Sequence, residues 1–354
     1  MSRVTIKDIA SQLNVSIATV DRALHNRGRI HEETYKQIML KVDELGYKPN
    51  RIASTLVKNT DTRIAFVTPK CNSFFEEIVR GAQTAADELL DFGVYIDFIT
   101  QDSFFDSLGQ AASMESLIEQ KPDGILVVPL HPLLLSTSID RASENGIPVI
   151  TVNLDSKESK RICYVGQDPE KTGAIIGTLF GKHMNKGGDI VILNGITEIS
   201  TLRLRADGFI NRLKNSYPGI NIIGSYEYVD DIKISFEIAK KIIKDIPSVS
   251  GIFANTAYGG VGVGMAIKEM GKCGSIVAAG FDTDYGVLDL LDCGALKATI
   301  TQNPYMEGYH SVKLLYKTIA EKIVPEREYN YTKADIIISS EQYELNEWGV
   351  SYNI

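Results

Sequence analysis

Four basic side chains gather in the stretch VSIATVDRALHNRGRI: Arg22, His25, Arg27 and Arg29. Such side chains suit contacts with the phosphates of a nucleic acid. The whole chain is nevertheless acidic, with a formal net charge of −8. Residues 1–60 hold ten Lys/Arg and six Asp/Glu, a net of +4, and the remaining 27 basic and 39 acidic residues give −12. A basic amino-terminal module on an acidic body favours contact with a polyanion at one end, although a merely solvated surface has the same pattern.

Capping residues and apolar periodicity predict three short helices around this stretch. Thr5 caps a helix from Ile6 to about Leu13, and Ser16 caps a second helix from Ile17 to Leu24. A third helix runs from Glu32 to about Leu45. Two helices joined by a tight turn, the second short and capped, are typical of a helix-turn-helix DNA reader, although any small three-helix bundle has the same outline.

The period of the second helix places apolar side chains on one face and leaves the other face available. Val20, Ala23 and Leu24 point inward. The residues on the outside are Ile17, Ala18, Asp21 and Arg22. Asp21 places a carboxylate beside Arg22 on this face, where its negative charge would be repelled by a DNA phosphate.

From Arg63 onward, apolar strands alternate with helical segments. The strands include IAFVTP, VYIDFIT, GILVVPL, PVITVN, DIVILNG, GIFAN and IVAAGFD. Continuous apolar strands separated by helices predict parallel sheets buried on both faces, an α/β fold. The strands fall into two sets, before and after about residue 163, so we expect two similar lobes. Ligands bind such sheets beyond the carboxyl ends of the strands, and the cleft between lobes is a favoured place.

The cysteines, histidines and hydropathy of the chain indicate where the protein is located and whether it binds a metal. The four cysteines form no CxxC pair and the five histidines make no metal-ligand spacing, so we expect reduced thiols, no metal and no cofactor. The first residues, MSRVTIKDIA, are too polar for a signal peptide, and no apolar run of about 18 residues occurs. We therefore expect a cytoplasmic protein that does not enter a membrane.

Four phrases in order, at family spacing, carry a resemblance to a known family: T-I-x-D-I-A, V-S-x-x-T-V-x-R-x-L, E-L-G-Y-x-P-N and A-x-x-L. They resemble the lactose/galactose repressor (LacI/GalR) family of bacterial transcription regulators. The rest of the chain is similar to that family's periplasmic-binding-protein-like (type I) body, through SFFEEIVRGAQTAADEL, IPVITVN, LRADGF and ATITQNPYMEGY. The expected fold is a small all-α helix-turn-helix head on a two-lobed α/β body.

The resemblance implies a division of the chain. Residues 1–48 form the DNA-binding domain, 49–61 the hinge helix and linker, and 62–354 the effector-binding and dimerisation domain. Lobe 1 takes about 62–162 and 303–330. Lobe 2 takes about 163–302 and 331–354.

The resemblance also implies which residues meet DNA. The helix from Ile17 to Leu24 would enter the major groove, where Ile17 and Ala18 occupy the positions that vary with operator and suit apolar contact with a thymine methyl. Ser16 would meet a phosphate through its hydroxyl and the helix amino terminus. RIASTLVK resembles the hinge helix, and Leu56 matches the family's intercalating leucine, which kinks the duplex unless it is only a core leucine. The full predicted set is Thr5, Ser16, Ile17, Ala18, Thr19, Asp21, Arg22, Asn26, Arg29, Ala53 and Leu56.

Asp21 departs from the family pattern, because most members carry Ser at this position near the phosphate backbone. A carboxylate there should repel phosphate unless Arg22, Arg27 or Arg29 neutralises it. We therefore hypothesise a salt-bridged Asp21 that orients a neighbouring arginine, against the alternative of a tolerated surface residue.

Pentose-binding relatives of the body imply a set of effector residues. Asn72 would bind a hydroxyl, Phe74 and Phe75 would pack on the sugar ring unless they belong to the core, and Arg205 would donate to sugar oxygens. Asn153 stands where relatives often have Asp, which puts a pentose in doubt. Planar Asn, Asp, Arg and Gln groups suit the paired hydrogen bonds of a polyol. The full predicted set is Asn72, Phe74, Phe75, Asn153, Asp155, Arg205, Asn255, Asp282 and Gln302.

The resulting hypothesis is a homodimeric, nucleoid-associated regulator, expected to be a repressor, that reads a pseudo-palindromic operator and senses a monosaccharide or related polyol. The same architecture with a non-sugar effector is an alternative. A transport binding protein is a more distant one, as is an α/β enzyme. YGGVGVGM spells no GxGxxG in a first βα unit, and no G-x-S-x-G elbow occurs, so we do not expect catalysis. Effector, operator and the sign of regulation are left open by the sequence.

Overall fold

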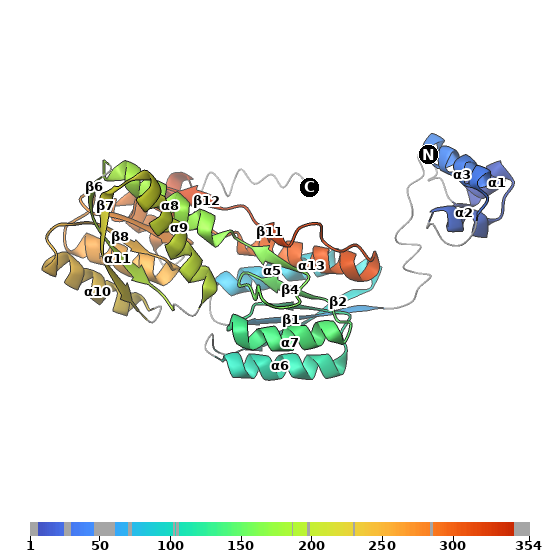
Figure 1. The fold of residues 1–354 in the computed structure, drawn as a ribbon, viewed down its shortest axis with the longest axis horizontal. Helices are drawn as coiled ribbons and strands as arrows, with labels where there is room; N and C mark the ends of the chain where they lie inside the picture. The colour runs from blue at the N-terminus through green and yellow to red at the C-terminus, as the bar shows by residue number, and fades with distance from the viewer. Residues whose placement is uncertain are drawn as a thin grey trace. The chain divides into compact units, whose positions relative to one another are not determined.

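The computed structural model (Figure 1) describes residues 6–24, 30–45, 61–69, 73–101, 103, 106–185, 187–196, 199–228, 231–283 and 286–342. Within these ranges, the side chains outside the description are those of Ile6, Lys7, Asp21 and Asp43. Contacts divide the chain into two units: Met1–Asp61 with Asp91–Gly93, and Thr62–Leu90 with Val94–Ile354. We call the helical part of the first unit the head and the second unit the body.

The head has the three predicted helices, α1 (Ile6–Leu13), α2 (Ile17–Leu24) and α3 (Glu32–Glu44). The turn between α1 and α2 is tight because Asn14 adopts a left-handed φ of 53°, which asparagine tolerates well. The apolar faces of the helices meet in one small core, whose fully buried members are Ile9, Ala10, Val20, Ala23 and Ile38. The predicted helices and their inward faces are confirmed.

Lobe 1 of the body is built on a sheet of six parallel strands in the order β11-β5-β4-β3-β1-β2. Its strands are β1 (Thr62–Pro69), β2 (Val94–Gln101), β3 (Gly124–Val127), β4 (Val149–Val152), β5 (Cys163–Gly166) and β11 (Tyr329–Tyr331). β3, β4 and β5 are buried throughout, as expected of strands covered by helices on both faces. β5 places the end of this lobe's first segment at Gly166, a few residues past the approximate boundary predicted at 162.

Helices cover both faces of the lobe 1 sheet. They are α5 (Ser73–Asp87), α6 (Ser107–Gln120), α7 (Pro132–Glu144) and α13 (Pro304–Ala320), with a 3-10 turn at Leu90–Phe92. α6 and α7 pack together on one face, and α5 packs against α13 on the other (Figure 1). α13 therefore returns to lobe 1 from far along the chain.

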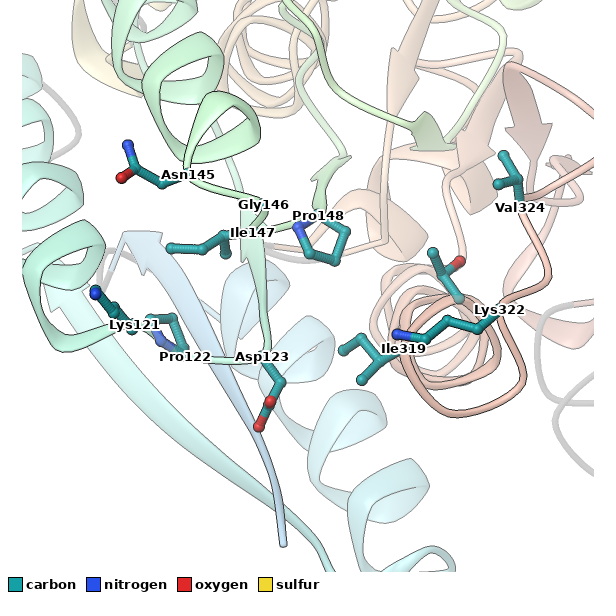
Figure 2. A pocket seen from close by; sticks show the side chains of 11 residues that line it. Lys121, Pro122, Asp123, Asn145, Gly146, Ile147, Pro148, Ile319, Lys322 and Val324 are labelled. Atoms are coloured by element: carbon teal, nitrogen blue, oxygen red, sulfur yellow. The ribbon is translucent and has the colours of Figure 1, made fainter. Parts of the chain in front are cut away.

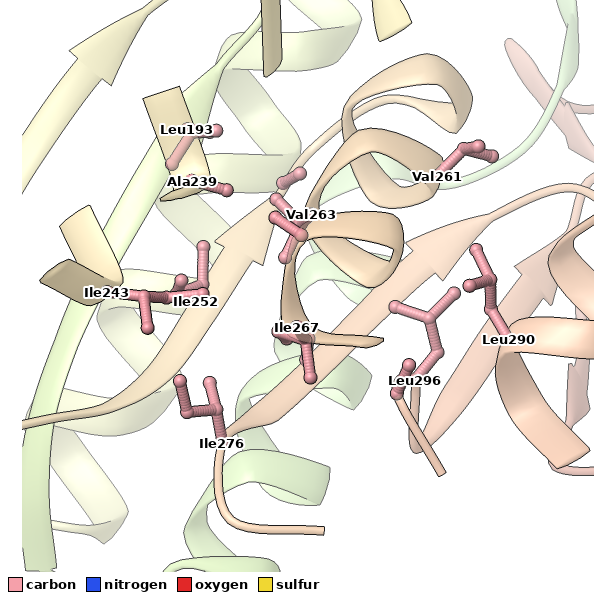
Figure 3. Packing of buried hydrophobic residues seen from close by; sticks show 14 of the residues in the cluster. Leu193, Ala239, Ile243, Ile252, Val261, Val263, Ile267, Ile276, Leu290 and Leu296 are labelled. Atoms are coloured by element: carbon pink, nitrogen blue, oxygen red, sulfur yellow. The ribbon is translucent and has the colours of Figure 1, made fainter. Parts of the chain in front are cut away.

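Lobe 2 repeats this plan with the strand order β12-β10-β9-β8-β6-β7. Its strands are β6 (Gly187–Asn194), β7 (Gly219–Glu227), β8 (Val249–Ala254), β9 (Val277–Phe281), β10 (Ala298–Thr301) and β12 (Asp335–Ile337), the last antiparallel to β10. Its helices are α8 (Pro169–His183), α9 (Ser200–Ser216), α10 (Ile232–Asp245), α11 (Ala257–Glu269) and α12 (Val287–Asp292). Figure 3 shows the core between α10, α11 and this sheet, where Val263, Ile252 and Ile267 are fully buried. The predicted two-lobed α/β body is confirmed.

The chain crosses between the lobes three times, after β5, after β10 and after β11. Hydrogen bonds join these crossings. The Nε2 of Gln167 donates to the carbonyl of Thr301 at 3.0 Å, and the backbone N–H of Thr332 donates to the carbonyl of Gly166 at 2.8 Å. The hydroxyl of Thr332 donates to the carbonyl of Gln302 at 3.3 Å. The three crossings thus form one connected hinge.

One glycine in each helix allows the paired helices to approach closely. A Cβ on Gly81 of α5 would lie 1.9 Å from the carbonyl oxygen of Tyr305 in α13. In lobe 2, a Cβ on Gly173 of α8 would lie 1.9 Å from the carbonyl oxygen of Arg205 in α9, and one on Gly208 of α9 would lie 2.0 Å from that of Glu170 in α8. These contacts set the helix spacing, and the one at Arg205 fixes a predicted effector residue.

No helix in the described ranges is both long enough and apolar enough to cross a lipid bilayer.

Candidate functional site

The amino terminus of α2 is held by Ser16. Its hydroxyl accepts a hydrogen bond from the backbone N–H of Thr19 at 3.1 Å and forms a second with the hydroxyl of Thr19 at 2.8 Å. This is the expected geometry of a serine cap, which satisfies an N–H group left free in the first turn. The cap and the first turn together present hydroxyl groups at the end of the helix where its dipole favours an anion.

The outer face of α2 carries the side chains predicted to read DNA. Ile17 is 47% exposed, and Ala18 and Arg22 are exposed beside it. Arg22 donates from its Nε to the carbonyl of Ala18 at 3.1 Å, and its side chain is exposed. An exposed isoleucine beside one exposed arginine is compatible with contact in a DNA groove.

Several predicted residues lie outside what the structure describes. They are Thr5, Asn26, Arg29, Ala53, Leu56, Asn72 and the side chain of Asp21. Their assignments, and the hypothesised ion pair of Asp21, stay predictions.

In the body, three of the predicted effector residues form one connected row. A guanidinium nitrogen of Arg205 donates to the Oε1 of Gln302. The Nε2 of Gln302 in turn donates to both carboxylate oxygens of Asp282, at 3.0 and 2.9 Å. The Arg205 guanidinium also lies over the ring of Phe281, 4.0 Å from its centroid. A fixed cation, amide and carboxylate side by side, with an aromatic face beneath, make an ordered polar surface.

Asn255 contacts this row through its backbone and not through its amide. Its carbonyl oxygen accepts from Arg205 at 3.2 Å. Its side-chain oxygen accepts from the N–H of Gly195 at 2.8 Å, and its amide nitrogen donates to the carbonyl of Leu202 at 2.9 Å. In this structure Asn255 positions the arginine by tying neighbouring loops together.

Asn153 is held on the lobe 1 side by Glu307, which the sequence prediction missed. Its Nδ2 donates to the Oε2 of Glu307 at 3.0 Å, and its carbonyl accepts from the hydroxyl of Tyr164 at 2.9 Å. Glu307 is fully buried on α13. Burial raises the pKa of its carboxyl well above the usual range, as does the charge of Asp282, while the hydrogen bond from Asn153 and the charge of Arg205 act in the opposite direction. The net effect shifts the carboxyl of Glu307 toward its neutral form.

Helical spacing was the signal for Glu307. The helix that begins at Pro304 buries Ser311 and Leu315, four and eight residues after Glu307. Residues four apart share one face of a helix, so the period alone places this glutamate on the buried side.

Asp155 is engaged elsewhere. Its Oδ2 accepts from a guanidinium nitrogen of Arg161 at 2.7 Å, and its Oδ1 accepts from the hydroxyl of Thr151 at 2.8 Å. The side chain of Arg161 is 2% exposed, so this is a nearly buried ion pair. The structure therefore does not bring Asp155 to the row formed by Arg205, Gln302 and Asp282.

The two aromatic residues at the start of α5 differ in exposure. Phe75 is buried, while Phe74 is half-buried, and their rings meet edge to face with centroids 5.3 Å apart. Phe75 is thus as buried as a core residue. Phe74 is the one of the two that remains partly accessible to a ligand.

Three polar residues at strand ends have an unusual backbone conformation. Asn153 follows β4, Asp282 follows β9 and Asn303 comes shortly after β10, with φ values of 62°, 60° and 54°. Asparagine and aspartate enter this left-handed region more readily than other residues with a side chain. They lie at the carboxyl ends of the strands, where α/β sheets bind ligands.

A separate concavity of about 480 Å³ lies at the other end of the lobe 1 sheet (Figure 2). It is lined by residues just before β3 and β4, such as Asp123 and Pro148, and by the last turn of α13 with Lys322 beyond it. None of the predicted effector residues borders it. The row of Arg205, Gln302 and Asp282 lies elsewhere, on α9 and at the carboxyl ends of β9 and β10 in lobe 2.

Together, a capped helix-turn-helix head and a hinged two-lobed body with polar strand ends define a class of protein: a DNA-binding regulator with a small-molecule sensing body. Comparison with known proteins agrees with this description. Residues 64–323 match the periplasmic binding protein domain family, and residues 5–50 match the lacI family of bacterial regulatory proteins. The chain belongs to the lactose/galactose repressor family of transcriptional regulators, with a periplasmic-binding-protein body.

Two curated relatives and one solved structure illustrate the likeness. The ribose operon repressor of Bacillus subtilis is 26% identical over 91% of this chain and 94% of its own. The ribose import binding protein RbsB of the same organism is 25% identical over 67% of this chain and 74% of its own. A solute-binding protein from Burkholderia graminis, solved in complex with D-arabinose, superposes with a TM-score of 0.72 at 25% identity, covering 80% of this chain and 97% of that one.

Proposed function

We propose that this regulator is a repressor whose hold on a pseudo-palindromic operator is controlled by a monosaccharide or related polyol bound between the lobes. The observation that carries the proposal is the row of Arg205, Gln302 and Asp282 at the hinge. It offers a donor and an acceptor fixed side by side, which suits adjacent hydroxyl groups of a sugar.

The relatives support the same class of effector. One is named for a ribose operon, one for ribose import, and one solved relative holds D-arabinose. In this chain Asn153 donates to the buried carboxyl of Glu307, so position 153 offers an amide and not a carboxylate on the lobe 1 side of the cleft. The effector therefore need not be the pentose of these relatives.

The switch follows from the hinge. An effector that contacts both lobes favours the arrangement in which those contacts form, and it can shift regulation only if the DNA-bound state binds it with a different affinity. We propose a homodimer, with two heads on the two operator half-sites, acting in the cytoplasm on the bacterial nucleoid. Release of DNA on effector binding is the direction we expect.

A thermal-shift screen of monosaccharides, sugar acids and polyols on the full chain tests the effector. A bound compound at 100 times its Kd adds about 2.7 kcal/mol to the free energy of unfolding. Asp282→Asn keeps the shape and the left-handed backbone but removes the charge, and it should weaken the response to the active compound at least tenfold. Asp289→Asn, an exposed change in the same lobe, should leave it unchanged. If no compound of these classes raises the melting temperature, the sugar effector is wrong.

A further inference from the structure

Two cysteines distant in sequence lie together at the surface of lobe 2. Cys273 lies in the connection between α11 and β9, and Cys293 directly follows α12. The residues after them are joined by the backbone, because the N–H of Gly274 donates to the carbonyl of Gly294 at 3.1 Å. The two loops therefore run against each other at the position of the cysteines.

The two side chains are close enough to influence each other, because Cys293 raises the pKa of Cys273. The Sγ of Cys293 donates to the carbonyl of Leu290 at 3.6 Å. Cys293 is exposed and Cys273 half-buried, so the sulfur of Cys293 is the more accessible of the two to solvent. Burial, and then the neighbouring Cys293, raise the pKa of Cys273, so the exposed thiol is the one that reacts first.

Cys163 differs in each of these respects. It is fully buried in β5, and burial raises the pKa of its thiol to about 12. A thiol without access or thiolate character is inert towards oxidants. The structure thus separates a buried structural cysteine from a surface pair.

We propose that Cys273 and Cys293 form a reversible intramolecular disulfide when a peroxide oxidises the protein. The Cys293 thiolate attacks one peroxide oxygen, the O–O bond breaks, and the departing hydroxide takes up one proton and leaves as water. The resulting sulfenic acid at Cys293 is attacked by the sulfur of Cys273. The S–S bond forms, the S–O bond breaks, and a second water leaves. In total, two thiols and one hydrogen peroxide give one disulfide and two waters, and a dithiol reductant reverses the change.

The disulfide would close a loop over residues 273–293. That loop contains all of β9, the residue Asp282 at its carboxyl end, and α12. Closing it restricts the unfolded chain and ties the connection before β9 to the end of α12. The disulfide therefore acts on the segment that carries Asp282. Its formation does not depend on what the row of Arg205, Gln302 and Asp282 binds.

Peroxide titration of the full chain tests the proposal. After treatment with hydrogen peroxide and alkylation with N-ethylmaleimide, mass spectrometry of the denatured protein should show the loss of two reactive thiols. Peptide mapping should show a link between the segments that contain Cys273 and Cys293. The oxidised protein should melt about 5 °C higher than the reduced one. Dithiothreitol should restore both thiols and the original melting temperature.

Single variants give the controls. Cys273→Ser should remove the cross-link and the melting shift, and should leave Cys293 to oxidise further to the sulfinic acid. Cys293→Ser should remove the cross-link and leave Cys273 alkylated. Cys71→Ser, a change elsewhere in the body, should behave as wild type. The proposal is overturned if oxidised wild-type protein still labels at both thiols, or if its only disulfide joins two chains on a non-reducing gel.

Discussion

Glu307 is a carboxyl group enclosed within lobe 1, where water cannot solvate its charge. It keeps Asn153 in place and faces the charges of Asp282 and Arg205 without contacting either in the hydrogen bonds of the structure. A neutral acid can donate or accept, so it can hold either orientation of the Asn153 amide. Glu307 can therefore influence the polarity of the region around Asn153 without contacting a ligand.

The raised pKa of Glu307 has a stability consequence with a definite sign. Its pKa in the unfolded chain is near 4.5, and in the folded protein it is higher. The stability that comes from keeping the acid neutral is complete below about pH 4.5 and is lost as pH rises toward the folded value. Glu307→Gln carries no such loss, so its melting temperature should gain on that of wild type as pH rises above about 4.5.

Thermal melts of both proteins across this pH range measure the effect. Glu326→Gln, a glutamate in an exposed loop, is the matched control and should track wild type. Parallel curves for Glu307→Gln and wild type would show that the acid is already ionised in the folded protein.

Other single residues mark where sequence patterns stop being informative. Asp155 stands two positions from Asn153, yet its carboxylate is committed to Arg161, six residues further on in an irregular loop. Nothing in the local pattern distinguishes the two, because the difference arises from how the loop folds back. The proximity of Cys273 and Cys293 was out of reach for the same reason, since it depends on two loops meeting.

At the scale of elements, the predictable features are those determined locally. The bounds of α1 and α2 follow from Ser16 and from apolar residues spaced at the helical period, and the structure reproduces both. The continuous apolar strands gave the class of sheet. The resemblance placed α5 and α13 in the same lobe, but local periodicity could not predict their direct pairing, which rests on a close approach at Gly81 and Gly308.

The glycine contact beneath Arg205 makes a test at this scale. In Gly173→Ala, the added methyl would overlap the Arg205 carbonyl, so α8 and α9 must move apart. We expect a loss of about 1–3 kcal/mol in the free energy of unfolding, the usual cost of overpacking, together with weaker effector binding because Arg205 moves. Urea denaturation measures the first and ligand titration the second.

Thr178→Ala shortens a half-buried side chain of the same helix and serves as the control. It should change both quantities little. A stable Gly173→Ala protein with unaltered ligand affinity would mean that the two helices adjust without displacing the arginine.

For the whole molecule, the opposed charges of its parts govern its behaviour with DNA. The segment of residues 1–60 carries a net of +4 and the rest −12, so only one end of the chain is attracted to a polyanion. Operator affinity should fall with salt, with a log–log slope of about −0.9 for each phosphate neutralised. Fluorescence anisotropy over a range of KCl concentrations gives this slope.

Arg22→Gln removes one exposed cation from the outer face of α2 and should make the slope less steep by about one. Lys36→Gln, on the exposed side of α3 where it already pairs with Glu32, is the matched change in the head. A slope near zero in wild type would refute electrostatic contact between the head and DNA.

The left-handed strand ends also limit how such a sensor can change its specificity. At Asn153, Asp282 and Asn303 the backbone accepts asparagine, aspartate or glycine at little cost and resists branched or bulky side chains. Few residue types are therefore tolerated at these positions, and the main substitution available exchanges an amide for a carboxylate of the same size. A mutant library designed to change the ligand specificity should be restricted to asparagine, aspartate and glycine at these strand ends, with wider diversity at other positions.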